Sequence, residues 1–84
     1  MKLKVLSVKP LQNKNLLLSF SNGEVRQFDV KPYIKGPWYG ELAEEEYFVK
    51  VFPAGGTVAW PNGQDIAPHE LYDLSVPAES EKTA

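Results

Sequence analysis

The sequence contains no cysteine, one histidine and one methionine in 84 residues. Without cysteine the chain can form neither a disulfide framework nor a thiolate site. Such a chain is compatible with a reducing compartment, and we expect a cytoplasmic protein. No apolar run approaches the roughly 20 residues that a membrane helix needs. The N-terminus also lacks the charged-then-apolar pattern of a signal peptide, so no membrane association is expected.

Positive charge is sparse as well. The formal net charge is −2. The nearest approach to a basic stripe is a set of lysines near the N-terminus: Lys2, Lys4, Lys9 and Lys14. Nonspecific nucleic-acid binding usually requires a basic face, so direct binding of nucleic acid is not expected. A DNA-associated transcriptional regulator is an alternative that would need such a face.

Apolar and aromatic side chains are well represented. Hydrophobic residues make up 43% of the chain and aromatic residues 12%, which is typical of a folded protein. A chain of this length forms one domain that buries roughly 60–65% of its unfolded surface. We expect that domain over residues 1–76. Residues 77–84 offer no apolar anchor and are expected to form a disordered tail.

The first strands are predicted from alternation. Residues 2–9 alternate as a strand, and the apolar parity shifts after Val5, which indicates a bulge. A second strand has apolar residues on one face: Leu16, Leu18 and Phe20. The third strand ends at residues 29–32, and we expect a helical turn after it, through about Ile34.

Asn22-Gly23 separates the second and third strands and is the strongest hairpin signal in the chain. Two registers are open. A two-residue loop pairs Ser21 with Glu24, whereas a three-residue loop with a bulge at Gly23 pairs Phe20 with Glu24. We expect the bulged register, because it places the apolar residues of both strands on one face: Leu16, Leu18, Phe20, Phe28 and Val30.

The middle of the chain is less regular. We expect in order a loop with two aromatic residues, a short helix, a strand, a turn and a strand: residues 35–40, 41–46, 47–52, 53–56 and 57–60. A six-residue helix is not stable alone in water, so Leu42 must dock it on the core. The four-residue turn would pair Phe52 with Thr57 and place Val49 on the same face as Trp60.

The stretch from Trp60 to Tyr72 combines a strand end, a tight turn and a helix start. Asn62 and Gly63 tolerate the left-handed conformation that such turns need. Pro68 then suits the first position of a helix. Residues 62–68 contain, in order, Asn-Gly, an Asp followed by a β-branched residue, and a Pro. Residues 22–32 contain the same residue types in the same order, with different spacing. Either two related units or independent use of the same turn chemistry would produce this pattern, and the second is the simpler interpretation.

These patterns together predict an α+β fold. The sheet is expected to be small and mostly antiparallel, with four or five strands and one or two short helices. Six residues are expected to serve as structural turn or cap residues: Asn22, Gly23, Asp29, Asn62, Gly63 and Asp65.

No residue pattern predicts catalysis or a metal site. His69 is the only histidine, and a zinc site normally needs three or four ligands. Asp29 and Asp65 lie near predicted strand ends, and a small enzyme using one of them is a further alternative. The simpler interpretation is that each accepts backbone N–H groups at a turn or helix start. We therefore expect no enzyme, no catalytic or metal-binding residue and no cofactor.

The aromatic residues are more numerous than one small core needs. Tryptophan and tyrosine are enriched at binding sites because they combine a large apolar area with a polar group. Four of them are hypothesised to bind a partner: Trp38, Tyr39, Trp60 and Tyr72. Trp38 and Tyr39 lie between Pro37 and Gly40, and at least one of the two is expected to be exposed. The partner is either an unknown protein or a second copy of the chain.

An ordered set of short motifs resembles a known family. The set comprises Phe20-x-Asn22-Gly23-Glu24, Phe28-Asp29, Leu42, Phe48, Trp60-Pro61-Asn62-Gly63, Asp65-Ile66 and Leu71-Tyr72. It is similar to the small bacterial domains of domain-of-unknown-function family 2442 over roughly residues 3 to 74. The resemblance implies a small α+β domain with no established activity. It also implies possible roles beside a second small protein, in toxin–antitoxin pairing, or next to a helix-turn-helix domain.

The leading function hypothesis is therefore a noncatalytic protein-interaction or regulatory module. The family resemblance extends it to the antitoxin-like half of a bacterial two-protein system. The aromatic surplus supports the interaction part of the hypothesis independently of the resemblance.

Overall fold

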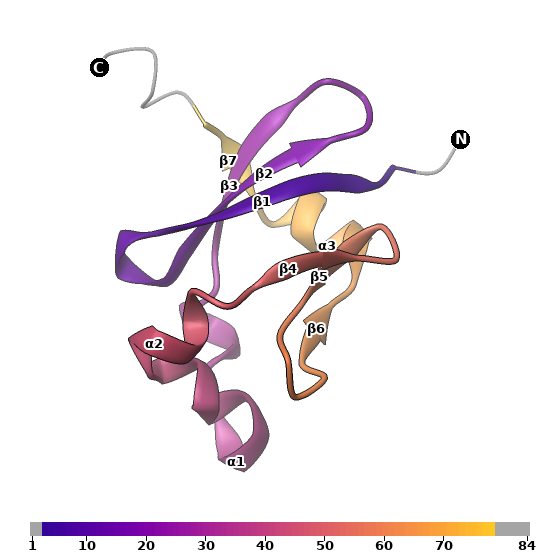
Figure 1. Ribbon diagram of the computed structural model, residues 1–84. Helices are drawn as coiled ribbons and strands as arrows, with labels where there is room; N and C mark the ends of the chain where they lie inside the picture. The colour runs from indigo at the N-terminus through magenta and orange to yellow at the C-terminus, as the bar shows by residue number, and fades with distance from the viewer. Residues whose placement is uncertain (1–2, 79–84) are drawn as a thin grey trace.

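The computed structural model describes residues 3–78 as an α+β domain (Figure 1). The strands and short helical turns follow one another in the order β1(Val5–Leu11), η1(Gln12–Lys14), β2(Asn15–Phe20), β3(Val25–Asp29), η2(Lys31–Tyr33), α1(Gly36–Tyr39), η3(Gly40–Ala43), α2(Glu45–Phe48), β4(Phe52–Ala54), β5(Thr57–Ala59), β6(Asp65–Ile66), α3(Pro68–Asp73) and β7(Val76–Pro77). The predicted fold class is confirmed.

The described strands form two antiparallel sheets rather than one. The larger has the order β1-β2-β3-β7 and the smaller β4-β5-β6. In Figure 1 the helical turns α1 and α2 lie together at the end of the molecule away from the β2–β3 hairpin. The backbone N–H of Val5 donates to the carbonyl of Gly56 at 2.8 Å and joins the two sheets.

The core lies between the two sheets and is closed at one end by the helical turns. Its members are buried apolar side chains from all parts of the chain: Val5, Leu16, Leu18, Phe20, Phe28, Val30, Leu42, Phe48, Val58, Trp60, Ile66 and Leu71. All five residues that the predicted hairpin register places on one face belong to it. Leu42 is fully buried, as its predicted docking role requires.

The β2–β3 hairpin has the predicted bulged register. Leu18 pairs with Arg26 and Leu16 with Phe28. The N–H of Phe20 donates to the carbonyl of Glu24 at 2.9 Å, and Gly23 has φ of 92°. The bulge predicted in β1 is also present, between Val5 and Ser7, although that strand runs over residues 5–11 rather than 2–9.

Gly23→Ala is expected to destabilise the domain by about 1 kcal/mol. A β-carbon on Gly23 would meet no atom within 4 Å, so the cost arises from the positive φ alone. Urea unfolding of the variant measures the change. A Gly23→Asn variant should recover part of the loss, because asparagine tolerates this conformation better than alanine. Equal stability of the alanine variant and the wild type would contradict the prediction.

The middle of the chain differs from the sequence expectation. Residues 36–39 form the helical turn α1 instead of a loop. The helix expected over 41–46 is broken at Glu44, which has extended backbone angles, and α2 then continues to Phe48. The strand expected over 47–52 is therefore wrong for most of its length. The helical preference of the glutamate run extends into the aromatic residues that follow it.

The hairpin between β4 and β5 also has a different register. Phe52 pairs with Ala59, and Ala54 pairs with Thr57 across a two-residue turn. That turn is Gly55-Gly56, with φ of 59° and 88°. Two successive positive φ angles suit the two-residue turns that match the twist of a hairpin. Val49 is 47% exposed, and its predicted place on the face of Trp60 is wrong.

The turn over residues 60–64 repeats the geometry of the turn over residues 20–24. The N–H of Trp60 donates to the carbonyl of Gln64, and the N–H of Gly63 to the carbonyl of Trp60, both at 2.9 Å. The equivalent bonds in the first turn have the same lengths. Each turn follows a buried aromatic residue, closes a hairpin and precedes a helical turn that contains a proline. β6 was not predicted from the sequence, in which this second turn is expected to lead directly into α3.

The C-terminal part of the described chain adds a strand to the larger sheet. Pro77 pairs with Arg26, and the N–H of Ala78 donates to the carbonyl of Val25 at 3.1 Å. The predicted boundary after residue 76 thus falls inside β7. The remainder of the predicted tail, residues 79–84, lies outside the described residues.

Proline occurs in three of the four edge strands of the two sheets. Pro10 lies in β1, Pro53 in β4 and Pro77 in β7. Proline has no N–H to offer a further strand. Backbone N–H groups point alternately to the two sides of a strand, and the N–H of Ala78 points to β3. The nitrogen of Pro77, which has no hydrogen to donate, therefore faces the open edge. The fourth edge, β6, has only two residues.

Candidate functional site

The structure separates the four aromatic residues that the sequence assigns to partner binding. Trp38 is 51% exposed, and Tyr39 and Tyr72 are partly buried. Trp60 is 1% exposed, and its indole Nε1 donates to the carbonyl of Phe48 at 2.9 Å. Trp60 is therefore a core residue and cannot contact a partner directly, which corrects its assignment to a binding surface.

Gln64 organises the region around Trp38. Its side chain is fully buried. The amide Nε2 donates to the carbonyl of Trp38 at 3.0 Å and to Oε1 of Glu41 at 2.9 Å, while Oε1 accepts from the Tyr47 hydroxyl at 2.7 Å. One buried amide thus joins the turn over residues 60–64 to α1, η3 and α2. A buried amide is tolerated only when its polar atoms are bonded, and here they are.

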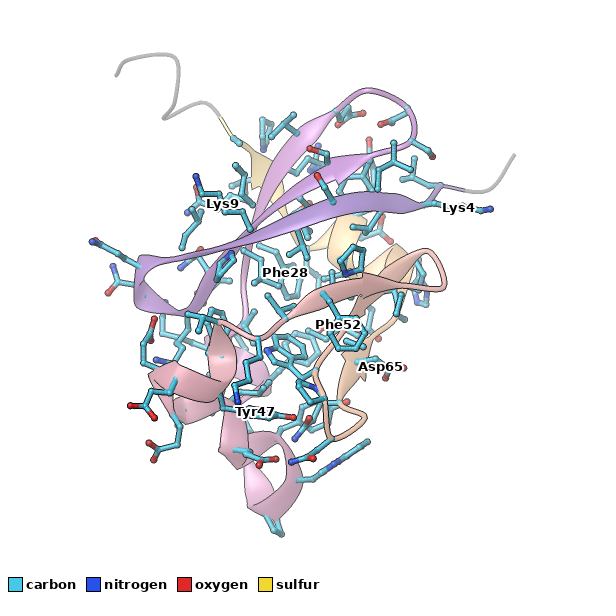
Figure 2. All side chains as sticks on the ribbon, in the orientation of Figure 1. Lys4, Lys9, Phe28, Tyr47, Phe52 and Asp65 are labelled. Carbon is cyan, nitrogen blue, oxygen red and sulfur yellow. The ribbon has the colours of Figure 1, made fainter. Side chains whose placement is uncertain are left out.

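Asn62 closes the same network at the surface. Its Nδ2 donates to both carboxylate oxygens of Glu41, at 2.9 and 2.7 Å, and its backbone N–H donates to the Tyr47 hydroxyl at 2.8 Å. These bonds from Asn62, with the bond from Gln64, hold the pKa of Glu41 below its usual value. Figure 2 shows Tyr47 between α2 and the turn that contains these residues.

Trp38 itself rests on this network. A β-carbon on Gly63 would lie 3.6 Å from Cζ2 of the indole, an ordinary van der Waals distance, so the ring lies beside this turn. The Tyr39 ring lies 5.2 Å from the Trp38 ring, and its hydroxyl donates to the carbonyl of Asp65 at 2.9 Å. We call the exposed indole with exposed Pro37, Asn62 and Gly63 the Trp38 surface. Its backbone on both sides is fixed by hydrogen bonds.

Tyr72 belongs to a separate network at the other turn. Its hydroxyl donates to Glu24 Oε2 at 2.7 Å, and its ring meets Phe20 edge to face at 5.3 Å. The Arg26 guanidinium lies 4.4 Å from the Tyr72 ring centroid and donates to Glu24 at 2.8 Å. Arg26 also donates to the hydroxyl and the carbonyl of Ser75, at 2.6 and 2.8 Å. This network attaches the end of α3 to the hairpin.

Stability is expected to fall as the pH drops below about 4.5. Hydrogen bonds from Tyr72 and Arg26 lower the pKa of Glu24, and those from Asn62 and Gln64 lower that of Glu41, relative to 4.5. A lowered folded-state pKa stabilises the fold above the unfolded pKa, and this stability is lost as the pH falls through the folded value. Melting temperatures between pH 7 and pH 3 test this dependence.

Three single substitutions, two tests and one control, show which carboxylates cause this pH dependence. Glu24→Gln and Glu41→Gln should each flatten the decline of melting temperature with falling pH. Glu44→Gln removes an exposed carboxylate that has no hydrogen bond to the described residues, and should leave the decline unchanged. Identical pH profiles for all three variants would show that other groups control the acid response.

The two aspartates differ in their surroundings. Asp29 Oδ1 accepts from the N–H of Lys31 at 2.9 Å and forms an ion pair with its ammonium group at 3.0 Å. The Asp65 carboxylate is exposed and bonds to no described side chain or backbone group, so its expected capping role is not seen. Ala67 occupies the N-cap position of α3 without a side-chain bond.

Within residues 3–78 the structure contains no pocket. In the same range no three His, Asp or Glu side chains come together in a way that could hold a metal ion. The described helices are also too short and too polar for any of them to cross a membrane.

The family comparison agrees with the structural boundaries. A family model matches residues 5–77, which is the stretch from the start of β1 to the end of β7. The chain belongs to DUF2442, a family of proteins of unknown function. No curated protein and no solved structure matches it. Membership in DUF2442 confirms the resemblance of the sequence motifs and assigns no activity.

The sequence alone does not identify Gln64, Glu41 and Tyr47 as members of this candidate site. The available signal was the second Asn-Gly turn. If residues 60–64 had been assigned the bulged geometry of residues 20–24, Gln64 would have paired with Trp60 beside the core. A glutamine in that place needs polar partners, but the sequence does not show which helical turn supplies them.

Proposed function

We propose that this DUF2442 chain is a noncatalytic protein-interaction module whose contact is centred on the Trp38 surface. The observation that carries the proposal is the combination of a half-exposed tryptophan with a fixed support. Large exposed aromatic residues are enriched among the residues that dominate binding energy. The bond from Gln64 to the Trp38 carbonyl fixes the backbone of this residue, and the Tyr39 ring packs beside its indole.

Pre-organisation is the reason to prefer a binding role for Trp38. An exposed aromatic residue on a mobile loop would lose conformational entropy on binding, whereas a fixed one loses little. Two helical turns and the turn over residues 60–64 share the bonds that fix Trp38. The indole edge can therefore enter a pocket on a partner without rearrangement of the domain.

The charges around the Trp38 surface favour a protein over a nucleic acid. The segment from α1 to α2 contains Glu41, Glu44, Glu45 and Glu46 and no basic residue. Three of the cationic side chains of the domain form ion pairs instead: Lys14 with Glu45, Arg26 with Glu24 and Lys31 with Asp29. Stacking of nucleic-acid bases on aromatic residues normally needs basic residues beside them. The DNA-associated alternative gains no support from this distribution.

We propose that the module acts as the regulatory half of a two-protein bacterial system. A surface that is already fixed, such as the Trp38 surface, would bind the partner in such a system with little loss of conformational entropy. The enzyme alternative would need a recess at Asp29 or Asp65, and residues 3–78 contain no pocket.

Trp38→Ala is expected to weaken partner binding at least tenfold while the domain stays folded. Loss of an aromatic hot spot weakens binding by about 2–4 kcal/mol. The change should cost less than about 1 kcal/mol of folding stability, because the side chain is 51% exposed. The measurement is affinity purification from the native cell with wild type and variant as paired baits, followed by calorimetry with the purified partner.

Leu74→Ala is the matched control for Trp38→Ala. Leu74 is 63% exposed and lies at the end of α3, outside the Trp38 surface. A partner that binds the control and the wild type equally, and the Trp38 variant at least tenfold more weakly, supports the proposal. Equal binding of that partner to the Trp38 variant would refute the placement of the contact.

A further inference from the structure

The larger sheet has a second face that no other described element covers. Side chains alternate across a strand, so the register assigns this face directly. It has three rows across the strands: Ser7, Ser19, Val25 and Ala78; Lys9, Leu17, Gln27 and Val76; Leu11, Asn15 and Asp29. We call these residues the outer face. In Figure 2, Lys9 lies on the opposite side of β1 from Phe28, whose ring points toward β4 and the core.

Five of the eleven residues of the outer face are apolar, and the charges on the face balance. Val25 is 44% exposed and Val76 59%. The face carries one cation, Lys9, and one anion, Asp29, and Asp29 is also paired with Lys31. The chain as a whole has a net charge of −2. Two copies that meet through this face would therefore bring no excess of like charge together.

We infer that the outer face binds the outer face of a second copy of the chain. In a two-fold dimer the same patch must be complementary to itself. An axis parallel to the strands, between β2 and β3, places β1 over β7 of the second copy and β2 over β3. Leu17 then faces Gln27, Ser19 faces Val25 and Asn15 faces Asp29.

The charges favour the axis parallel to the strands over an axis perpendicular to them. With the axis parallel to the strands, neither Lys9 nor Asp29 meets its own copy. The amide of Asn15 can instead donate to the Asp29 carboxylate, and Lys9 lies over the apolar side chain of Val76. An axis perpendicular to the strands, along the row of Leu17, would place Lys9 on Lys9. Like charges in direct opposition are destabilising.

The size of the face predicts a weak dimer. It contains about half of the 20–30 residues per side that a standard interface has. The prolines in β1 and β7 disfavour the competing route, in which two sheets join through their edges. Face-to-face packing of sheets is a common way to cover such a surface. The dimer is therefore expected only at high protein concentration.

Sedimentation equilibrium of the full chain tests the dimer. The wild type is expected to be mainly dimeric at millimolar concentration and monomeric at micromolar concentration. Leu17→Lys places a charge in the middle row, and should weaken the dimer at least tenfold. Leu17 faces outward, and circular dichroism checks that the variant is folded. Val49→Lys, on an exposed residue outside the outer face, should dimerise like the wild type.

The absence of native cysteine allows a test of the axis. Ser19→Cys and Val25→Cys chains are prepared separately and oxidised alone or as a mixture. Because Ser19 faces Val25 of the other copy, the mixture should give more disulfide-linked dimer than either chain alone. Trp38→Ala should leave the dimer intact, so this inference and the proposed partner contact can fail independently. A monomer at every concentration, unchanged dimerisation of Leu17→Lys, or no gain from mixing would overturn the inference.

Discussion

Trp60→Ala is expected to destabilise the domain by about 4 kcal/mol. Trp60 is 1% exposed, its ring lies 6.0 Å from that of Phe48, and its Nε1 bonds to the Phe48 carbonyl. The variant would lose these contacts, leave a cavity and leave the carbonyl without its donor. A domain of this length has a total stability of roughly 4–13 kcal/mol, so the loss is a large part of it. Urea unfolding at neutral pH measures the change.

Two further variants separate the causes. Trp60→Phe keeps most of the apolar volume but removes the indole N–H, and should cost less than Trp60→Ala. Trp38→Phe leaves Trp60 as the only tryptophan, so its fluorescence reports the core alone during unfolding. A Trp60→Ala chain that unfolds at the wild-type urea concentration would show that the indole does not support the core.

Gln64→Ala is expected to cost about 3 kcal/mol. The change leaves the Trp38 carbonyl, a Glu41 oxygen and the Tyr47 hydroxyl without one partner each, and an unsatisfied buried group costs about 1–3 kcal/mol. Tyr47 retains its bond from Asn62, and Glu41 retains two, so the full sum is not reached. Thermal and urea unfolding both measure the effect.

The matched control for Gln64→Ala is Asn62→Ala. Asn62 is exposed, and water can replace its bonds to Glu41, so this change should cost less than about 1 kcal/mol. Gln64→Ala should also weaken any binding that depends on Trp38, because it frees the backbone of α1. A Gln64 variant with wild-type stability would show that the buried amide does not hold the helical turns in place.

The first half of the fold could be predicted because its signals are local. Alternation assigns the core face of β2, and Asn22-Gly23 limits the hairpin to two registers. Only the bulged register places Phe28 beside Leu16, and the structure has it. A requirement for burial on one face thus decided between two local solutions.

The segment from Lys35 to Ala54 could not be predicted in the same way. Its aromatic residues are compatible with a strand, and its glutamates with a helix. The choice depends on contacts with distant residues, such as the bond from the Tyr47 hydroxyl to Gln64. A helical turn of four residues has little stability of its own, so the sequence of the turn does not reveal it.

The site was predictable only in part for the same reason. Exposure of Trp38 follows from its position between Pro37 and Gly40, where no alternation directs it inward. The support beneath it depends on Gln64, which lies 26 residues away along the chain. Trp60 and Trp38 have similar chemistry, and only the tertiary structure assigns one to the core and the other to the surface.

The prolines of the edge strands limit how large an assembly of this chain can become. Strand addition could in principle continue from copy to copy without an end, because each added sheet offers a new edge. Pro10, Pro53 and Pro77 interrupt three of the four edges, and the fourth is only two residues long. A face that is complementary to itself is used up once two copies have met. Assembly through the outer face therefore stops at a pair, and a concentrated solution should contain discrete particles instead of fibres.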